Sequence, residues 1–292
     1  MREGAAGTMG GRMSILQAIV LGLTQGATEY APVSSSGHLI LVPWLFGWTD
    51  ILANPDLNKT FDVALHMGTL LGALIYFRSD ILRYLRAFVA SIRARQIREV
   101  DQKLAWAIVI GTIPGVIAGA ALENVIQEHL GQPWLIAVML AVFGVVLWAV
   151  DRWAPQDRPF QSVGVRTGLY LGVAQALALQ PGVSRSGITM TAGRTIGLDR
   201  PATARFSFLL SLPVIAGAGA YKGIDLAKTG FQGYGSEFFW GFVASAVSGY
   251  VVIAVLLHYL RRHGFGVFMW YRLGLAALCF SLIATGALSA TV

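Results

Sequence analysis

The amino-acid sequence predicts an all-α polytopic membrane protein with six transmembrane helices and two re-entrant helical hairpins in an inverted repeat. Three observations predict this fold: an apolar composition, apolar runs of which two are broken by polar motifs, and a repeat between the two halves of the chain. Of the 292 residues, 55% are hydrophobic and only 13% are charged, whereas a soluble domain carries about 25% charged residues. This composition excludes soluble globular, disordered and disulfide-rich secreted proteins, and the single Cys279 has no partner for an intramolecular disulfide.

Six apolar runs are each long enough to cross about 30 Å of hydrocarbon. Four are almost wholly apolar, and the other two carry Asp62, His66 and Ser207 and are expected to line something polar. The runs are 61–78, 104–122, 134–150, 205–222, 237–257 and 273–290. Residues 1–12 are Gly-rich and polar and are expected to be disordered. The prediction is therefore one membrane domain over 13–292, with repeats of about 13–150 and 163–290.

Two further apolar segments are broken where a spanning helix should continue. Residues 14–30 run into Glu29, Pro32 and the letters SSSGH, and residues 166–180 run into PGVSRSG. Non-helical backbone at membrane depth is tolerated only where protein or a polar cavity surrounds it. Each segment is therefore predicted to form a re-entrant hairpin whose tip approaches the membrane midplane.

The basic residues predict the orientation. Sixteen of the twenty-two Lys and Arg lie in 78–103, 151–166, 194–205 and 258–272, whereas 49–60, 123–133 and 223–236 carry only Lys59 and Lys228. Since cytoplasmic connections are the basic ones, the first four stretches are predicted to be cytoplasmic and both termini to lie outside. The first hairpin then enters from the outer face and the second from the inner face. The net charge of +7 is attributed to this asymmetry, so no nucleic-acid partner is expected.

An internal repeat supports the same layout. Residues 21–38 and 171–188 agree at seven of eighteen positions at an offset of 150, including Gly22 with Gly172 and Gln25 with Gln175. In the predicted topology the two copies have opposite orientation. Inverted repeats with broken helices place the functional site near the midplane, where the breaks meet.

Ionisable residues at membrane depth are costly and usually functional, and Glu29 is the first candidate. It either exchanges protons with a ligand or is a pore-facing or helix-end charge that reaches the interface. The run Ser34-Ser35-Ser36-Gly37-His38 follows and starts a short helix, where hydroxyls and free N–H groups form an anion site. One serine would suffice as an N-cap. His38 lies one turn beyond Ser35, so both are expected to face the same ligand.

The second tip adds an arginine to the same pattern. Arg185 in a broken apolar segment has a large desolvation cost unless an anion meets it, and its guanidinium suits a bidentate phosphate contact. Ser184, Ser186 and Thr189 supply hydroxyls, and Gly182 and Gly187 let the backbone approach a ligand. The alternative is a salt bridge between Arg185 and Glu29 that locks the hairpins together. A carboxylate, an imidazole, hydroxyls and an arginine suit phosphoryl transfer, and their location predicts a phosphate carried on a hydrophobic tail.

These motifs carry a family resemblance over residues 14–290. The segments at 25–38 (QGATEYAPVSSSGH), 61–72 (FDVALHMGTLLG), 181–190 (PGVSRSGITM) and 200–213 (RPATARFSFLLSLP) resemble the undecaprenyl-diphosphatase, or bacitracin-resistance, family. The resemblance implies hydrolysis of undecaprenyl diphosphate, a polyprenyl diphosphate lipid, to the monophosphate. It also implies a bacterial inner-membrane protein with a site accessible from the outer face, competition by bacitracin through sequestration of the substrate, and a possible homodimer.

The resemblance also assigns roles to residues. The family's E/Q-x-x-x-E motif falls on Gln25 and Glu29, its essential histidine on His38, its candidate nucleophile on Ser35 and its phosphate-binding arginine on Arg185. Members require a divalent cation, Mg²⁺ or Ca²⁺, for which Glu29 is a possible ligand; this sequence has no dedicated cage, so the cation is expected to arrive with the substrate. The predicted binding residues are Gln25, Ser34, Ser36, Gly37, Ser184, Ser186, Gly187 and Thr189.

Several alternatives stay open at the level of sequence. The nucleophile is Ser35, a water or His38, the last through a phosphohistidine. A lipid-phosphate transporter is the main rival, because inverted repeats with broken helices are typical of alternating access. The type-2 phosphatidic acid phosphatases share an SGH motif, but no histidine occurs at 190–195 after Ser184-Arg185. A structural role leaves Glu29, His38 and Arg185 unexplained.

Overall fold

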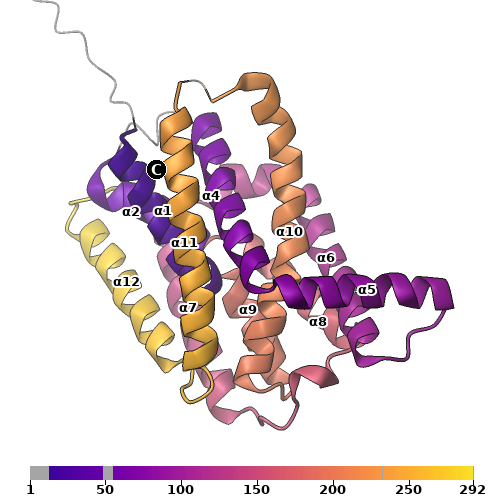
Figure 1. Ribbon diagram of the computed structural model, residues 1–292. Helices are drawn as coiled ribbons and strands as arrows, with labels where there is room; N and C mark the ends of the chain where they lie inside the picture. The colour runs from indigo at the N-terminus through magenta and orange to yellow at the C-terminus, as the bar shows by residue number, and fades with distance from the viewer. Residues whose placement is uncertain (1–12, 49–54, 232, 292) are drawn as a thin grey trace, which may run out of the picture.

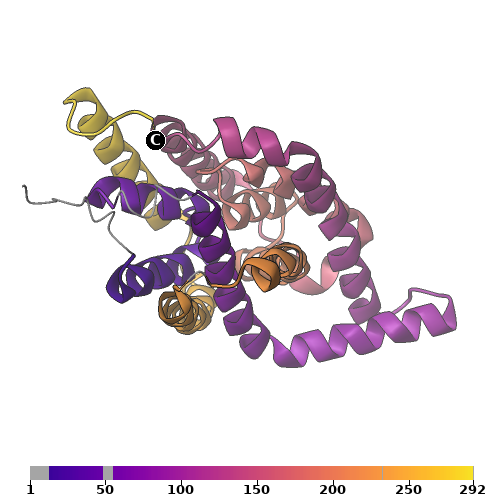
Figure 2. The ribbon, with the colours of Figure 1, turned by 90° about the horizontal axis from the view of Figure 1, so that it is seen from above.

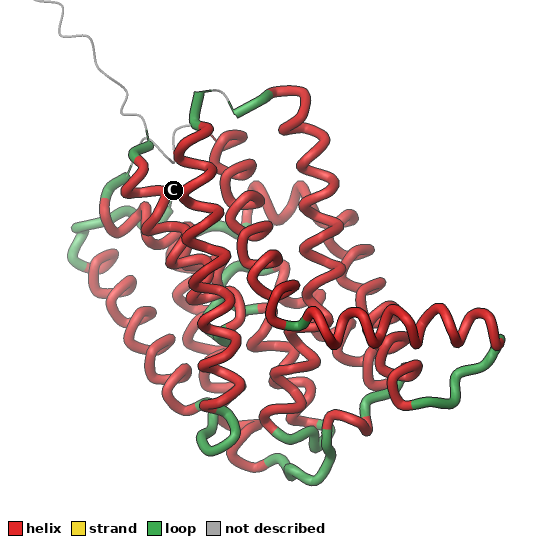
Figure 3. The backbone as a smooth tube through the Cα atoms, in the orientation of Figure 1, coloured by secondary structure: helices red, strands yellow, loops and turns green. Residues whose placement is uncertain are grey.

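The computed structural model describes residues 13–48, 55–231 and 233–291, and every regular element in them is a helix (Figures 1 and 3). The predicted disordered tail, 1–12, lies outside these residues. The helices are α1 Ile15–Tyr30, α2 Ser35–Phe46, α4 Pro55–Tyr76, α5 Arg78–Ala94, α6 Val100–His129, α7 Pro133–Trp153, α8 Val165–Ala176, α9 Arg185–Thr195, α10 Arg200–Thr229, α11 Gly235–Tyr259 and α12 Gly266–Ala284, with short 3₁₀ helices at Phe160–Ser162 and Leu177–Leu179.

The prediction of an all-α polytopic membrane protein is confirmed. Within the described residues, five helices are long and apolar enough to cross a membrane, and α4 with α5 makes a sixth candidate that is bent by 81°. Helices α6, α7, α10 and α11 cover the spans predicted at 104–122, 134–150, 205–222 and 237–257. The span predicted at 273–290 is shifted, because α12 already begins at Gly266 and ends at Ala284. The predicted start was too late because Arg272, which was expected to end a cytoplasmic connection, is buried within the helix.

The predicted basic connection at 78–103 is largely a helix. Helix α5 follows α4 after a sharp bend at Phe77 and lies at the periphery of the bundle in both ribbon views (Figures 1 and 2). Its arginines alternate with exposed apolar side chains at helical spacing, among them Leu82, Leu85 and Val89. Helices that combine basic and apolar side chains in this way are typical of a membrane interface, and an interfacial position of α5 is a prediction.

Two of the sixteen basic residues assigned to cytoplasmic connections are fully buried. Arg194 lies in the last turn of α9 and donates through Nε to Asp151 Oδ1 at 2.9 Å, and Arg272 lies inside α12. Buried arginines with internal partners report on the interior of the fold, not on the side of the membrane. The predicted orientation rests on the remaining fourteen and stays a prediction.

Both helix breaks occur where the repeat predicts them. Helix α1 ends at Tyr30 and α2 begins at Ser35, while α9 begins at Arg185 after the 3₁₀ turn that ends α8. The residues that cap α2 and α9, Ser34 and Ser184, have φ of 74° and 75°, and each accepts a hydrogen bond from the glycine three residues later. A positive φ is uncommon for serine. Its occurrence at both repeat positions indicates that the two tips share one backbone design. Whether both tips re-enter the membrane stays a prediction.

The packing of the two halves is reciprocal. Helix α1 packs along α11, and its repeat counterpart α8 packs along α6. At the matching positions Gly22 and Gly172, a Cβ would collide with the backbone carbonyl of Gly241 and Gly111 respectively. Small residues let helix backbones approach closely in membranes, so the repeated glycine sets the same contact twice. In Figure 1, α2 lies toward the top of the bundle and α8 and α9 toward the bottom, as expected for opposed hairpins.

The close contact at Gly172 predicts a stability effect. Gly172→Ala is expected to lower the free energy of unfolding by roughly 1–3 kcal/mol, because the added methyl group forces α8 away from α6. Thermal unfolding in detergent measures the change. Gly217→Ala is the matched control, since nothing lies within 4 Å of a Cβ at that position of α10. Equal unfolding midpoints for the two variants would contradict the expectation.

Candidate functional site

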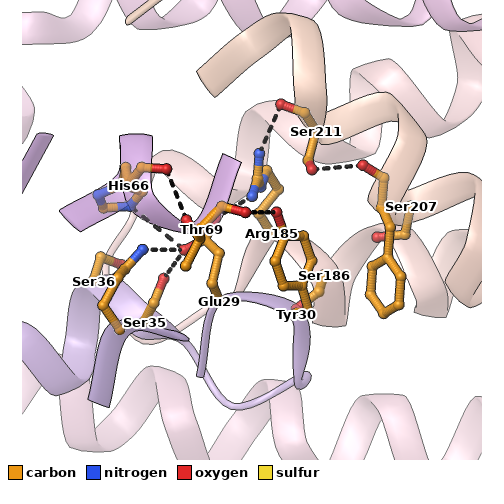
Figure 4. Close-up of polar contacts among 12 residues, drawn as sticks. Glu29, Tyr30, Ser35, Ser36, His66, Thr69, Arg185, Ser186, Ser207 and Ser211 are labelled. Atoms are coloured by element: carbon orange, nitrogen blue, oxygen red, sulfur yellow. Dashed lines mark hydrogen bonds and ion pairs between the residues drawn. The ribbon is translucent and has the colours of Figure 1, made fainter. Parts of the chain in front are cut away.

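Glu29 is the centre of a buried polar cluster at the end of α1. The residue is only 5% exposed, and its Oε2 accepts hydrogen bonds from Ser35 Oγ at 2.5 Å and Gln25 Nε2 at 2.8 Å. The other oxygen, Oε1, accepts from Nη2 of Arg185 (Figure 4). Both carboxylate oxygens are therefore engaged by donors, as a buried charge requires.

Arg185 brings the second tip to the first. It is the first residue of α9, and besides the ion pair with Glu29 it donates through Nη1 to the carbonyl of Ser211 at 3.3 Å. The salt bridge considered as an alternative is thus the geometry observed, and it joins residues 156 positions apart. The guanidinium also lines a cavity, so it can reach an anion there.

A cavity of about 280 Å³ opens beside the cluster. Its polar lining consists of Glu29, Ser34, Ser35, Ser36, His66, Gln175, Ser184 and Arg185. The rest is mostly apolar and includes Val63, Leu179, Val214 and Ile215. A cavity with hydroxyls, a carboxylate and a guanidinium at one side and an aliphatic wall at the other suits an amphiphile with an anionic head.

Ser34 both lines the cavity and supports the tips, whereas Ser186, Gly37, Gly187 and Thr189 support the tips without lining it. Ser34 Oγ accepts from the backbone N–H of Gly182 at 2.9 Å, and Ser186 Oγ donates to the carbonyl of Ala31 at 3.0 Å. These two bonds cross between the tips. Gly37 and Gly187 donate to the capping serines, and Thr189 Oγ lies 2.5 Å from Ser207 Oγ.

His38 lies outside the cavity. Its Nδ1 is 2.7 Å from the carbonyl oxygen of Ser34, and its Nε2 is 2.7 Å from the hydroxyl of Tyr271, against whose ring it stacks. Ser35 instead points at Glu29. The structure therefore does not bring His38 and Ser35 to one ligand, and a catalytic role for His38 stays a prediction.

His66 is a site residue whose contact with Glu29 was not predicted from the sequence, which indicated only that it would line something polar. It lies on α4, with Nε2 at 3.5 Å from Glu29 Oε2 and Nδ1 at 2.7 Å from the carbonyl oxygen of Asp62. Because a carbonyl only accepts, Nδ1 carries a proton, and Nε2 is the nitrogen presented to Glu29. The signal was present in the motif at 61–72, where His66 interrupts an apolar run.

Arg272 was counted as a loop charge, yet it holds both tips. The side chain is fully buried and donates to five backbone carbonyls, with distances of 2.7–3.2 Å. Two of them, Pro32 and Gly182, belong to the first and the second tip, and Leu140 belongs to α7. Non-helical backbone leaves carbonyls without helix partners, and the guanidinium supplies the missing donors.

Removing this donor is expected to be costly. Arg272→Met should lower the free energy of unfolding by roughly 3 kcal/mol or more, because it leaves several buried carbonyls without partners. The midpoint of thermal unfolding in detergent is the measurement, with the exposed Arg261→Met as the matched control. An unchanged midpoint in Arg272→Met would show that the tips hold their shape without it.

Within the described residues, the side chains do not fit a dedicated site for the expected divalent cation. No three His, Cys, Asp or Glu side chains in the described part of the chain are grouped so as to hold a metal ion. Glu29 is the carboxylate of the cavity lining, and Arg185 already occupies one of its oxygens.

Comparison with known proteins agrees with the site geometry. The family model described as "Bacitracin resistance protein BacA" matches residues 18–278. The chain is 44% identical over 273 residues to the undecaprenyl-diphosphatase of Gemmatimonas aurantiaca, and the matched region covers 94% of this chain and 99% of that protein. It is 42% identical to that of Thermomicrobium roseum (93% and 99% covered) and 45% identical to that of Geobacter sulfurreducens (89% and 95% covered). The similarity therefore spans both broken helix pairs and every helix that lines the cavity.

Proposed function

The chain belongs to the bacitracin resistance protein BacA family, and on this premise we propose that the cavity beside Glu29 is where it hydrolyses undecaprenyl diphosphate. The products are undecaprenyl phosphate and inorganic phosphate, and the reaction recycles the lipid carrier of bacterial cell-wall synthesis. One observation carries the assignment to this cavity: the Glu29–Arg185 pair lies at the polar side of a cavity whose other wall is aliphatic. The diphosphate then lies at the pair and the polyprenyl chain against the apolar wall.

Arg185 binds the diphosphate in this scheme. Its guanidinium turns from Glu29 to the phosphate oxygens and stabilises the charge that develops on them, which is the main contribution a protein makes to phosphoryl transfer. Ser34, Ser35 and Ser36 line the same side of the cavity and add hydroxyl donors. Release of Glu29 from Arg185 leaves the carboxylate free to accept a proton.

Ser35 is the favoured nucleophile, with a water in the same place as the other route. Its hydroxyl already donates to Glu29, which is the geometry of a nucleophile beside its general base. As Ser35 Oγ bonds to the terminal phosphorus, the bond to the bridging oxygen breaks and undecaprenyl phosphate leaves with the electron pair. Water then hydrolyses the phosphoserine; in the direct route, water attacks the phosphorus at once. His38 is disfavoured because Tyr271 and Ser34 engage its two ring nitrogens.

The surroundings complete the proposal. The protein lies in the bacterial inner membrane with the site open to the outer, periplasmic face. Bacitracin competes by sequestering the substrate, and a homodimer is its possible assembly. Mg²⁺ or Ca²⁺ enters with the diphosphate, because the described residues form no cage for it.

Phosphate release from undecaprenyl diphosphate by the purified protein tests the proposed function. Release in detergent, with and without Mg²⁺ or Ca²⁺, is the expected result. Reconstituted liposomes separate the enzyme from a lipid-phosphate transporter, which the two opposed broken helix pairs would also suit. Phosphate release without movement of lipid phosphate across the bilayer supports the enzyme alone. Movement without release would overturn the hydrolase.

A further inference from the structure

Gln175 presents an unpaired amide to the cavity. The residue lies near the end of α8, is only 4% exposed, and lines the same cavity as Glu29 and Arg185. Neither Nε2 nor Oε1 has a hydrogen-bond partner among the described residues. Buried side-chain amides in native proteins are nearly always hydrogen-bonded, so this one calls for a ligand.

The repeat shows which partner Gln175 lacks. Gln25, the repeat counterpart of Gln175, donates to Glu29 four residues later on the same helix. The residue four positions after Gln175 is Leu179, which accepts nothing through its side chain. The first repeat thus uses its glutamine to hold the carboxylate, and the second leaves the equivalent amide free.

The opposite wall leaves room for this amide. Gly115 of α6 also lines the cavity, and a Cβ at that position would lie 2.9 Å from Gln175 Nε2. A larger residue would press on the amide or turn it away from its present position. The glycine therefore keeps the amide head where a molecule in the cavity can reach it.

We propose that Gln175 is a substrate-binding residue that donates through Nε2 to a phosphate oxygen of the lipid diphosphate. The proposal rests on the proposed function and extends it: the second repeat contributes two phosphate ligands, Arg185 as the charged one and Gln175 as the neutral one. Oε1 is left to accept from a water or from a protonated phosphate oxygen. Because the amide is neutral, its bond contributes to binding in the ground state as well as in the transition state, so its loss raises KM more than it lowers kcat.

Gln175→Leu tests the proposal, because leucine has a similar size and no polar atom. With undecaprenyl diphosphate as substrate, KM is expected to rise about tenfold or more, while kcat stays within about threefold. The midpoint of thermal unfolding is expected to stay equal or rise, since a buried amide without a partner has been removed. Gln156→Leu, on the exposed connection before α8, is the matched control and should leave KM unchanged.

Gln175→Glu provides a second test of the same contact. A carboxylate in this position repels the diphosphate, so KM should rise further than in Gln175→Leu. An unchanged KM in Gln175→Leu, or a KM lowered by Gln175→Glu through capture of Mg²⁺, would overturn the proposal. A joint fall of the unfolding midpoint and kcat at unchanged KM would assign Gln175 a structural role and overturn it as well. Failure of the proposed function looks different, because the wild-type protein would then release no phosphate.

Discussion

Glu29→Gln should lower the rate of phosphate release from undecaprenyl diphosphate on the order of a thousandfold. Glutamine has the size of glutamate and its carbonyl oxygen can still accept from Ser35 and Gln25, so the cluster keeps most of its contacts. What it loses is the ability to take the proton from the attacking oxygen. The loss should therefore appear in kcat under saturating substrate, measured by phosphate release in detergent.

The exposed Glu99→Gln controls for the change of charge. Glu99 lies at the start of α6, in the connection that follows α5, and its variant should hydrolyse the substrate at the wild-type rate. A folded Glu29→Gln protein that keeps more than a tenth of the wild-type rate would rule out Glu29 as the general base.

Arg185→Ala is the second large effect, again on the order of a thousandfold in kcat/KM. The guanidinium belongs to the arginine of the cavity lining, and the variant removes its charge from the place where the diphosphate binds. Arg185→Lys should recover part of the rate, because lysine keeps the charge but not the planar fork. Phosphate release at several substrate concentrations separates the two contributions.

Arg166→Ala is the matched control, because Arg166 is an exposed arginine on α8 of the same broken pair. Its rate should equal that of the wild type. If Arg185→Ala and Arg166→Ala hydrolyse the substrate equally well, Arg185 only locks the tips together and the proposed binding role is lost.

Much of the fold follows from local pattern. The length of the apolar runs predicted the spans, and a proline or glycine beside serines predicted both helix breaks. Both features can be recognised from the sequence because they act within one or two turns of helix. Helix α5 was missed because a run of arginines looks like a loop when its apolar neighbours at helical spacing are not counted. The start of α12 was predicted wrongly because a charged side chain inside a span is stable only when it has hydrogen-bond partners. The partners of Arg272 come from distant segments of the chain.

The site divides in the same way. Glu29, Ser35 and Arg185 were identifiable because each lies beside a break, and the structure brings the three together. His38 shows the limit of reasoning from spacing. A step of three residues along a helix rotates the side-chain direction by about 300°, which is short of a full turn. Ser35 and His38 therefore point in different directions, Ser35 to Glu29 and His38 to Tyr271. The contribution of His66 depends on how α4 packs against α1, which no local pattern reveals.

Arg272 also bears on how the protein is made. Its helix follows both tips in the chain, so the ribosome delivers every residue of the Glu29 cluster before it delivers the guanidinium that holds Pro32 and Gly182. Until α12 is inserted, the carbonyls of Pro32 and Gly182 lack the hydrogen bonds that Arg272 donates to both tips. The Glu29 cluster is therefore expected to reach its full stability only after α12 has been inserted.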